Sequence, residues 1–234
     1  RYCDVLCAPN QSKSLTNLPL YEHMDLRFLL TSLLLPRLEE SPEARIVHVS
    51  AKAHEWGNIS IQDLRSRKVL DLDFQKRQMR MMGNLGGSYA DSKLAQVLYT
   101  LALARRLPPN VVTHSLHPAI VETGLLSRDA FGVFEKYLHA YIMTPVATWI
   151  GFMQSKEDAP KTQIHVSTHP SVQAASGRYY SALSPPLVNC GQQAEDCGVA
   201  SISAIASNRL LQEELFEASC ELLGLTDGLC AQEA

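Results

Sequence analysis

The chain has 234 residues, of which 46% are hydrophobic and 19% charged, and its formal net charge is −3. This composition supplies a sizeable apolar core, which excludes a globally disordered chain. The net charge leaves no basic excess for binding nucleic acid, so no nucleic-acid partner is expected. The first residue is Arg1 rather than Met, which indicates a processed chain or part of a longer one.

The six cysteines do not form the patterns of a metal or disulfide scaffold. No Cys-x-x-Cys pair occurs, and disulfide frameworks are inferred mainly in chains of under about 100 residues. We therefore expect mostly reduced thiols in a reducing, intracellular compartment, and a surface loop around Cys190 and Cys197. The apolar runs fall short of the roughly 18 residues that suggest a membrane span.

Strands and helices alternate along the predicted chain, because short apolar runs alternate with apolar faces at helical spacing. In order, we expect a strand over 2–8, a buried helix over 20–38 ending near Pro36, a strand over 45–49, an irregular stretch over 51–85, a helix over 88–107, a strand over 111–116, an amphipathic helix over 131–153, a helix over 157–167, a strand over 177–181, an irregular insertion over 185–206, a helix over 207–223 capped by Gly224, and a flexible tail over 226–234. This alternation predicts an α/β fold with a parallel sheet in a single domain, 1–234.

One motif suggests chemistry. Tyr89, Ser92 and Lys93 form Y-x-x-S-K at the start of the predicted helix over 88–107. Tyrosine and lysine four residues apart lie on one helical face, and a nearby ammonium lowers the pKa of a phenol from about 10. Such a phenol can act as a general acid or base. Taken alone, the pair is also common on solvated helices.

Flanking segments give the motif a context. H-V-S-A at 48–51 ends one predicted strand, L-H-P-A-I-V-E-T at 116–123 ends the next, and the motif helix continues as L-A-Q-V-L. Together with S-G-R-Y-Y at 176–180, these segments resemble the short-chain dehydrogenase/reductase family, near its retinol dehydrogenase-like and WW-domain oxidoreductase-like members. The resemblance covers roughly residues 2–225. It implies a Rossmann-like, doubly wound parallel sheet that binds a nicotinamide dinucleotide.

The resemblance assigns roles to matching residues. Tyr89 would exchange a proton with the substrate oxygen, and Lys93 would hold the nicotinamide ribose and lower the tyrosine pKa, so both also count as cofactor-binding. Pro118, Val121 and Thr123 match the segment that flanks the nicotinamide and phosphates. The cofactor is NADP or NAD, and the residue that selects between them has no counterpart in this chain.

The family's catalytic serine is not matched. Its position falls on Ala51, whose methyl group cannot orient a carbonyl, while Ser50 lies one residue away and is kept as a candidate catalytic residue. Because adjacent strand residues face opposite sides, Ser50 would need a bulge to take that role. Ser60 or Ser88 are alternatives. Loss of one oriented donor lowers rates by about 10²–10³ in an oxyanion site, so catalysis is expected to be impaired.

The sheet implied by the resemblance lacks its first strands. No glycine-rich strand-turn-helix motif occurs, and the G-N-L-G-G cluster at 83–87 lies in a predicted loop. With about 30 residues per βαβ unit, roughly 75–90 residues of the family pattern are missing before Tyr2. The chain therefore looks like a cut inside the family fold.

Three smaller features of the sequence each allow more than one interpretation or none. His23 falls at the family's helix asparagine and is either a proton relay or a surface histidine. His114 and His117 straddle a strand end without converging ligands, so no metal site is expected. Residues 131–153 are rich in aromatics and either cap the core, cover a lipid-like substrate or touch a membrane surface.

Two functions remain open from the sequence. The first is an NAD(P)(H)-dependent oxidoreductase lineage acting on an apolar alcohol or carbonyl such as a retinoid, steroid or lipid aldehyde. The second is a non-catalytic family member that serves as a structural or assembly subunit. In either case we expect a homodimer or a subunit of a complex, located in the cytoplasm or associated with an organelle or membrane.

Overall fold

The fold is built on three parallel strands. It is seen in a computed structural model that describes residues 20–65, 88–118, 120–121, 153–154, 159–181 and 198–231. Strands β1 (Ala44–Val49), β2 (Val111–His117) and β5 (Arg178–Ser181) form the sheet in the order β1-β2-β5. All pairings are parallel, with Val49 opposite Leu116 and Leu116 opposite Tyr180. The predicted α/β class with a parallel sheet is confirmed.

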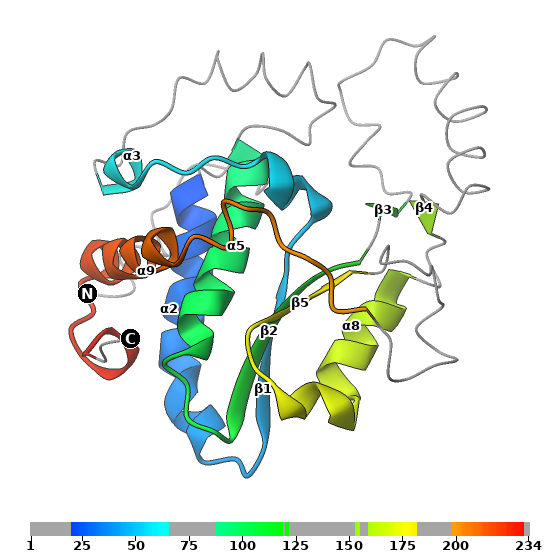
Figure 1. Ribbon diagram of the computed structural model, residues 1–234. Helices are drawn as coiled ribbons and strands as arrows, with labels where there is room; N and C mark the ends of the chain where they lie inside the picture. The colour runs from blue at the N-terminus through cyan, green and yellow to red at the C-terminus, as the bar shows by residue number, and fades with distance from the viewer. Residues whose placement is uncertain are drawn as a thin grey trace, which may run out of the picture.

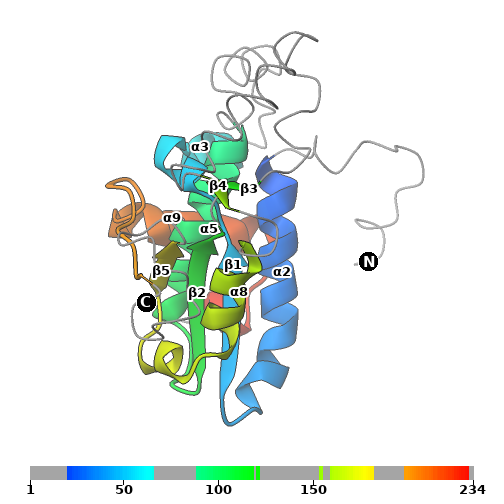
Figure 2. The same ribbon diagram turned by 90° about the vertical axis from the view of Figure 1, so that its right-hand side faces the viewer.

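Helices cover both faces of this sheet. Helices α2 (Leu20–Glu39), α5 (Ser88–Ala104) and α9 (Arg209–Leu223) lie on one side, and α8 (Ala159–Thr168) lies on the other (Figures 1 and 2). Shorter elements are η2 (Lys52–Trp56), α3 (Ile61–Arg65), η4 (Pro170–Ala174), η5 (Gly228–Ala231) and the parallel pair β3 (Ile120–Val121) and β4 (Met153–Gln154). None of the described helices is long and apolar enough to cross a membrane.

The main core lies between the sheet and the three-helix face. All seven residues of β2 are buried because this strand has a neighbour on either side and helices on both faces. Leu94 and Leu98 of α5 pack with Phe28 of α2 and Phe216 of α9 in one cluster. A smaller cluster beneath α8 joins Leu116, Val166, Val172 and Tyr180. Helix α5 is therefore the most enclosed helix, as its apolar sequence predicts.

Helix α2 differs from the expected buried helix. Among the α2 side chains that the structure describes, from Leu26 onward, Phe28, Thr31 and Leu35 are buried. Four leucines of the same helix are 48–66% exposed, namely Leu26, Leu30, Leu33 and Leu34. A run of apolar residues predicts burial all round, but α5 covers one side of α2 only. The helix also continues past Pro36 to Glu39. A proline this close to the end of a helix removes only one hydrogen bond of the last turn, so the helix does not have to end there.

The C-terminal region folds back onto helix α9. Helix α9 ends at Gly224, whose left-handed backbone, φ 64°, forms the predicted cap. Beyond it, Leu229 is buried against the main core, and Cys220 and Cys230 form a disulfide with Cα atoms 5.8 Å apart. Residues 228–231, which we expected in a flexible tail, form η5. The expectation of mostly reduced thiols does not hold for Cys220 and Cys230, because the turn at Gly224 brings the chain back to the helix.

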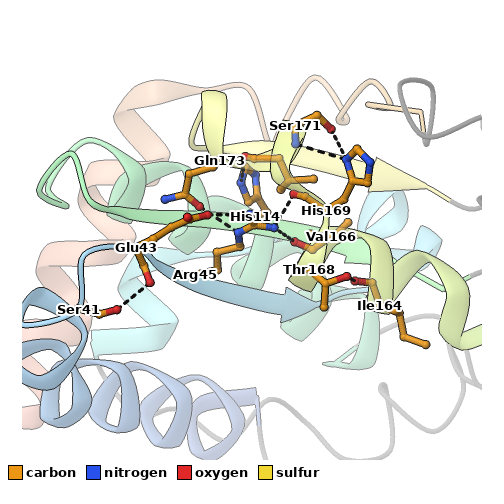
Figure 3. Close-up of polar contacts among 11 residues, drawn as sticks. Ser41, Glu43, Arg45, His114, Ile164, Val166, Thr168, His169, Ser171 and Gln173 are labelled. Carbon is orange, nitrogen blue, oxygen red and sulfur yellow. Dashed lines mark hydrogen bonds and ion pairs between the residues drawn. The ribbon is translucent and has the colours of Figure 1, made fainter.

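A partly buried arginine joins the start of β1 to the end of α8. The Arg45 guanidinium donates to the backbone carbonyls of His169, at 2.7 Å, and Val166, and to the side chain of Gln173 (Figure 3). A cation at a helix C-terminus is favoured by the helix dipole. This contact fixes α8 against the sheet at the edge opposite the Tyr89 motif.

Several predicted features lie outside the described residues. They are the strand over 2–8, the glycine cluster over 83–87, Thr123, nearly all of 131–153, and the loop with Cys190 and Cys197. The side chains of His23, Ser88, Ile120 and Val121 also lie outside the description. The remaining predicted elements are found within a few residues of their expected bounds.

Candidate functional site

The motif residues lie on the first two turns of α5. Tyr89 and Lys93 share a face, with the lysine Nζ 5.5 Å from the centroid of the tyrosine ring. Both side chains are partly buried, whereas Ser92 is buried and its hydroxyl donates to the Tyr89 carbonyl at 2.7 Å. The structure therefore brings together the tyrosine and lysine of the motif and uses Ser92 within the helix.

Two hydrogen bonds fasten this part of α5 to the end of β1. The Lys93 Nζ donates to the Val49 carbonyl at 3.1 Å, and the Ser50 hydroxyl donates to the Lys93 carbonyl at 2.8 Å. Ser50 is buried and thus joins strand to helix. These bonds hold the carboxyl end of β1 against the first turns of α5. A catalytic role for Ser50 at a substrate stays a prediction.

The protonation states differ from the expectation. Burial raises the pKa of Tyr89, and no lowering by Lys93 offsets it. Burial, which is the larger cause, and the nearby positive charge of Arg27 together lower the pKa of Lys93 to about 8. Burial disfavours the charged phenolate, and this effect outweighs the lowering of the tyrosine pKa that the Tyr89–Lys93 spacing predicted.

The segment after β1 packs directly against the motif turns. Ala51, at the position of the family serine, has an extended backbone, and η2 begins at the next residue. A Cβ added at Gly57 would lie 2.6 Å from the Ala90 carbonyl oxygen, so only glycine allows this approach. The next backbone amide, of Asn58, donates to the Asp91 carboxylate at 2.7 Å.

Asp91 is a candidate site residue that the sequence pattern did not predict. It lies between Tyr89 and Lys93 on α5, is largely buried, and burial raises its pKa to about 6. The amide of Asn58 acts against this rise by favouring the carboxylate. The available signal was an acidic residue inside Y-x-x-S-K on an otherwise apolar helix.

The end of β2 carries the second part of the predicted site. Pro118 follows this strand and is partly buried, and Val121 lies in β3, which pairs with β4. His114 and His117 point to opposite faces of β2, because His114 bonds to the Val172 carbonyl and His117 to the Ser181 hydroxyl. Within the described ranges no three potential metal ligands gather.

Comparisons with known proteins place these features in a family. Retinol dehydrogenase 11 of Homo sapiens is 33% identical over 85% of this chain and 51% of its own length, and retinol dehydrogenase 12 of Bos taurus is 34% identical over the same shares. Dehydrogenase/reductase SDR family member 13 of Bos taurus is 30% identical over 86% of this chain and 45% of its own length. The chain spans about half the length of the curated relatives it matches.

Other comparisons add less. No protein-family model matches the chain. A crystal structure of an uncharacterized protein from Mycobacterium Paratuberculosis aligns at a TM-score of 0.49 and 24% identity, over 85% of this chain and 55% of that one. The similarity to the curated relatives extends over the motif helix and the strands around it, in agreement with the resemblance of the motifs. The chain belongs to the short-chain dehydrogenase/reductase family, and retinol dehydrogenases are among its homologues.

Proposed function

We propose that this chain carries the proton-transfer half of an NAD(P)(H)-dependent oxidoreductase that acts on an apolar alcohol or carbonyl, with retinoids as the first substrates to test. The observation that supports this most is the Tyr89–Lys93 pair, fastened to the carboxyl end of β1. In parallel α/β sheets, ligands bind at the carboxyl ends of the strands. The names of the relatives point to retinol as substrate class.

The described residues fit a nicotinamide dinucleotide on one side of the site. The Lys93 ammonium lies at the carboxyl end of β1 with hydrogen-bonding capacity left after its contact with Val49, and Pro118 begins the segment that the family uses beside the nicotinamide. When bound, the dinucleotide supplies or accepts the hydride at the substrate carbon.

Tyr89 would act as the general acid that protonates the substrate oxygen. In carbonyl reduction its phenol donates the hydroxyl proton to the substrate oxygen as the carbon gains the hydride, and solvent returns a proton to the phenolate. A raised pKa keeps Tyr89 protonated at neutral pH, which suits this direction better than alcohol oxidation. Lys93 would stabilise the transient phenolate through its positive charge.

Ala51 would make this catalysis slow. No hydroxyl extends from the position where the family serine orients the carbonyl, and the Ser50 hydroxyl already donates to Lys93. We therefore expect Ala51→Ser to raise the rate of retinal reduction, by about tenfold or more if one oriented donor is restored. The test is NAD(P)H-dependent reduction of all-trans-retinal by wild type, Ala51→Ser and Tyr89→Phe, with product measured by chromatography. Equal rates for wild type and Tyr89→Phe would overturn the proposal.

A second candidate is a non-catalytic assembly subunit. Two observations favour it, namely Ala51 and the exposed leucines of α2. This candidate predicts a stable homodimer or complex and no tyrosine-dependent turnover even with Ala51→Ser. Analytical ultracentrifugation of the purified chain, combined with the retinal assay, separates the two candidates. An active monomer would exclude the assembly role.

The proposed setting is intracellular, with peripheral contact to a membrane that holds the apolar substrate. Two observations support this setting, namely the aromatic composition of 131–153, of which the structure describes only Met153, and the retinol dehydrogenase names of the relatives. Co-sedimentation with phosphatidylcholine vesicles tests it. Loss of binding on deletion of 131–153 is the expected result, and vesicle binding unaffected by the deletion would contradict it.

A further inference from the structure

A buried polar network joins the ends of the strands beside the Tyr89–Lys93 site. Its members are His54 of η2, Tyr179 and Ser181 of β5, and His117 of β2, all almost fully buried. The His54 and Tyr179 rings lie 4.8 Å apart between centroids, and those of His117 and Tyr179 lie 6.1 Å apart. His117 Nε2 lies 2.7 Å from the Ser181 hydroxyl oxygen. None of these side chains has a role in the proton transfer described above.

His54 is the central member of this network, because it binds the Ala51 carbonyl and so closes the turn over residues 51–54, called the Ala51 turn below. Its Nδ1 lies 2.9 Å from the Ala51 carbonyl oxygen and 3.3 Å from the Tyr179 hydroxyl oxygen. A carbonyl oxygen only accepts, so Nδ1 carries the ring hydrogen. The His54 backbone amide donates to the same carbonyl at 3.0 Å. One side chain thus closes the turn after β1 and reaches β5, 125 residues further along the chain.

The other ring nitrogen supports the same tautomer. His54 Nε2 is buried and has no hydrogen-bond partner among the described residues. A hydrogen placed on Nε2 would therefore be an unpaired buried donor, which is costly. Burial lowers the pKa of His54, against the opposing effects of the Ala51 carbonyl and Glu55, and Lys52 lowers it further. The ring is accordingly neutral at physiological pH.

The Ala51 turn directly follows the two residues that hydrogen-bond to Lys93. Ala51 follows Ser50, whose hydroxyl holds the Lys93 carbonyl, and Val49, whose carbonyl receives the Lys93 Nζ. At the other end of η2, Gly57 touches Ala90 and Asn58 bonds to Asp91. A looser turn at Ala51 would therefore expose to water the end of β1, where Lys93 is held.

We propose that His54 and Tyr179 are positioning residues of the Tyr89–Lys93 site, which fix the turn after β1 to the end of β5 and so keep the Lys93 ammonium in its partly desolvated place. The inference rests on the proposed function for its meaning, because that function makes Lys93 part of the site. Its test needs neither cofactor nor turnover, so failure of the two proposals is distinguishable.

The experiment titrates Lys93 by ¹³Cε NMR in the folded protein, with Lys93→Arg to assign the signal. His54→Gln removes the donor at the Nδ1 position, whereas His54→Asn places an amide N–H there and serves as the conservative variant. Tyr179→Phe removes only the hydroxyl. The matched control is His114→Asn, which removes a buried histidine's bond to the Val172 carbonyl on the opposite face of the sheet.

The expected results separate positioning from general destabilisation. We expect the pKa of Lys93, about 8 in the wild type, to rise by about half a unit or more in His54→Gln, and to rise less in Tyr179→Phe. His54→Asn and His114→Asn should leave it near the wild-type value. In ¹⁵N spectra of the wild type, His54 should show the Nδ1–H tautomer. An unchanged lysine pKa in folded His54→Gln or Tyr179→Phe, an equal rise in His114→Asn, or an Nε2–H tautomer would overturn the inference.

Discussion

Gly57→Ala tests how closely the η2 segment must approach the motif helix. The glycine backbone is extended, φ −74° and ψ 149°, so alanine fits its conformation and would by itself stabilise by about 0.4–1 kcal/mol through the unfolded chain. The new Cβ, however, would lie 2.6 Å from the Ala90 carbonyl oxygen and 2.8 Å from the Leu94 Cβ. Neither atom is the end of a flexible side chain. Overpacking of this kind costs about 1–3 kcal/mol, so we expect a net loss of roughly 1–2 kcal/mol.

Urea and thermal unfolding followed by circular dichroism measure this loss. For a chain of this size, 1–2 kcal/mol corresponds to a fall of roughly 2–8 °C in Tm. Asn58→Ala is the control, because its side chain is exposed and its backbone amide can still bond to Asp91, so its effect should stay within about 0.5 kcal/mol. A Gly57→Ala protein as stable as the wild type would refute the close contact between η2 and α5.

Three further predictions concern stability. Glu213→Ala should cost roughly 3 kcal/mol in urea unfolding, because it leaves the buried Arg106 guanidinium without its carboxylate. Replacing Cys220 and Cys230 with serine should cost roughly 2–3 kcal/mol, because the short loop they close gains freedom on unfolding. The free energy of unfolding should fall as the pH drops from about 6.5 to 4. The reason is that three buried histidines, with pKa values of about 4 in the folded protein, take up protons on unfolding; they are His48, His114 and His117. Asp91 opposes this trend, because its pKa is raised to about 6 in the folded protein, so its contribution to stability, present below its unfolded pKa, is lost as the pH rises through 6.

Each of these predictions has an outcome that contradicts it. The control for Glu213→Ala is Glu221→Ala, which breaks the exposed ion pair with Arg65 and should lower the free energy of unfolding by under about 1 kcal/mol. Equal losses of stability in the two variants would contradict the expected effect of burial. A stability unaffected by reductant would contradict the disulfide. Near pH 5, three imidazoles gain a proton and Asp91 releases one on unfolding, so unfolding free energy should fall by about 2.7 kcal/mol per pH unit of acidification. A flat profile would exclude neutral buried histidines.

Local sequence patterns predicted the elements that carry the site. Helix α5 and strands β1, β2 and β5 follow from apolar periodicity, and Y-x-x-S-K placed Tyr89 and Lys93 on one face, where the structure has them. The cap at Gly224 also follows from its place after a helical pattern.

The rest depends on contacts that no local pattern encodes. His54 lies within hydrogen-bond distance of Tyr179 across 125 residues of sequence, and Arg45 donates to Val166 of α8 across 121 residues. The exposed leucines of α2 were predicted to be buried, because apolar character does not reveal which neighbours surround a helix. The tyrosine pKa was predicted to be low from spacing alone, whereas burial, which only the fold determines, raises it.

The central claim is that Tyr89 transfers the substrate proton in a dinucleotide-dependent reaction. The most direct measurement is deuterium transfer from nicotinamide-deuterated NADPH or NADH to all-trans-retinal, by wild type, Ala51→Ser and each with Tyr89→Phe. We expect slow transfer in the wild type, faster transfer in Ala51→Ser, and a loss of about 10²-fold or more with Tyr89→Phe. Transfer that is absent even in Ala51→Ser, or that does not depend on Tyr89, would contradict the claim.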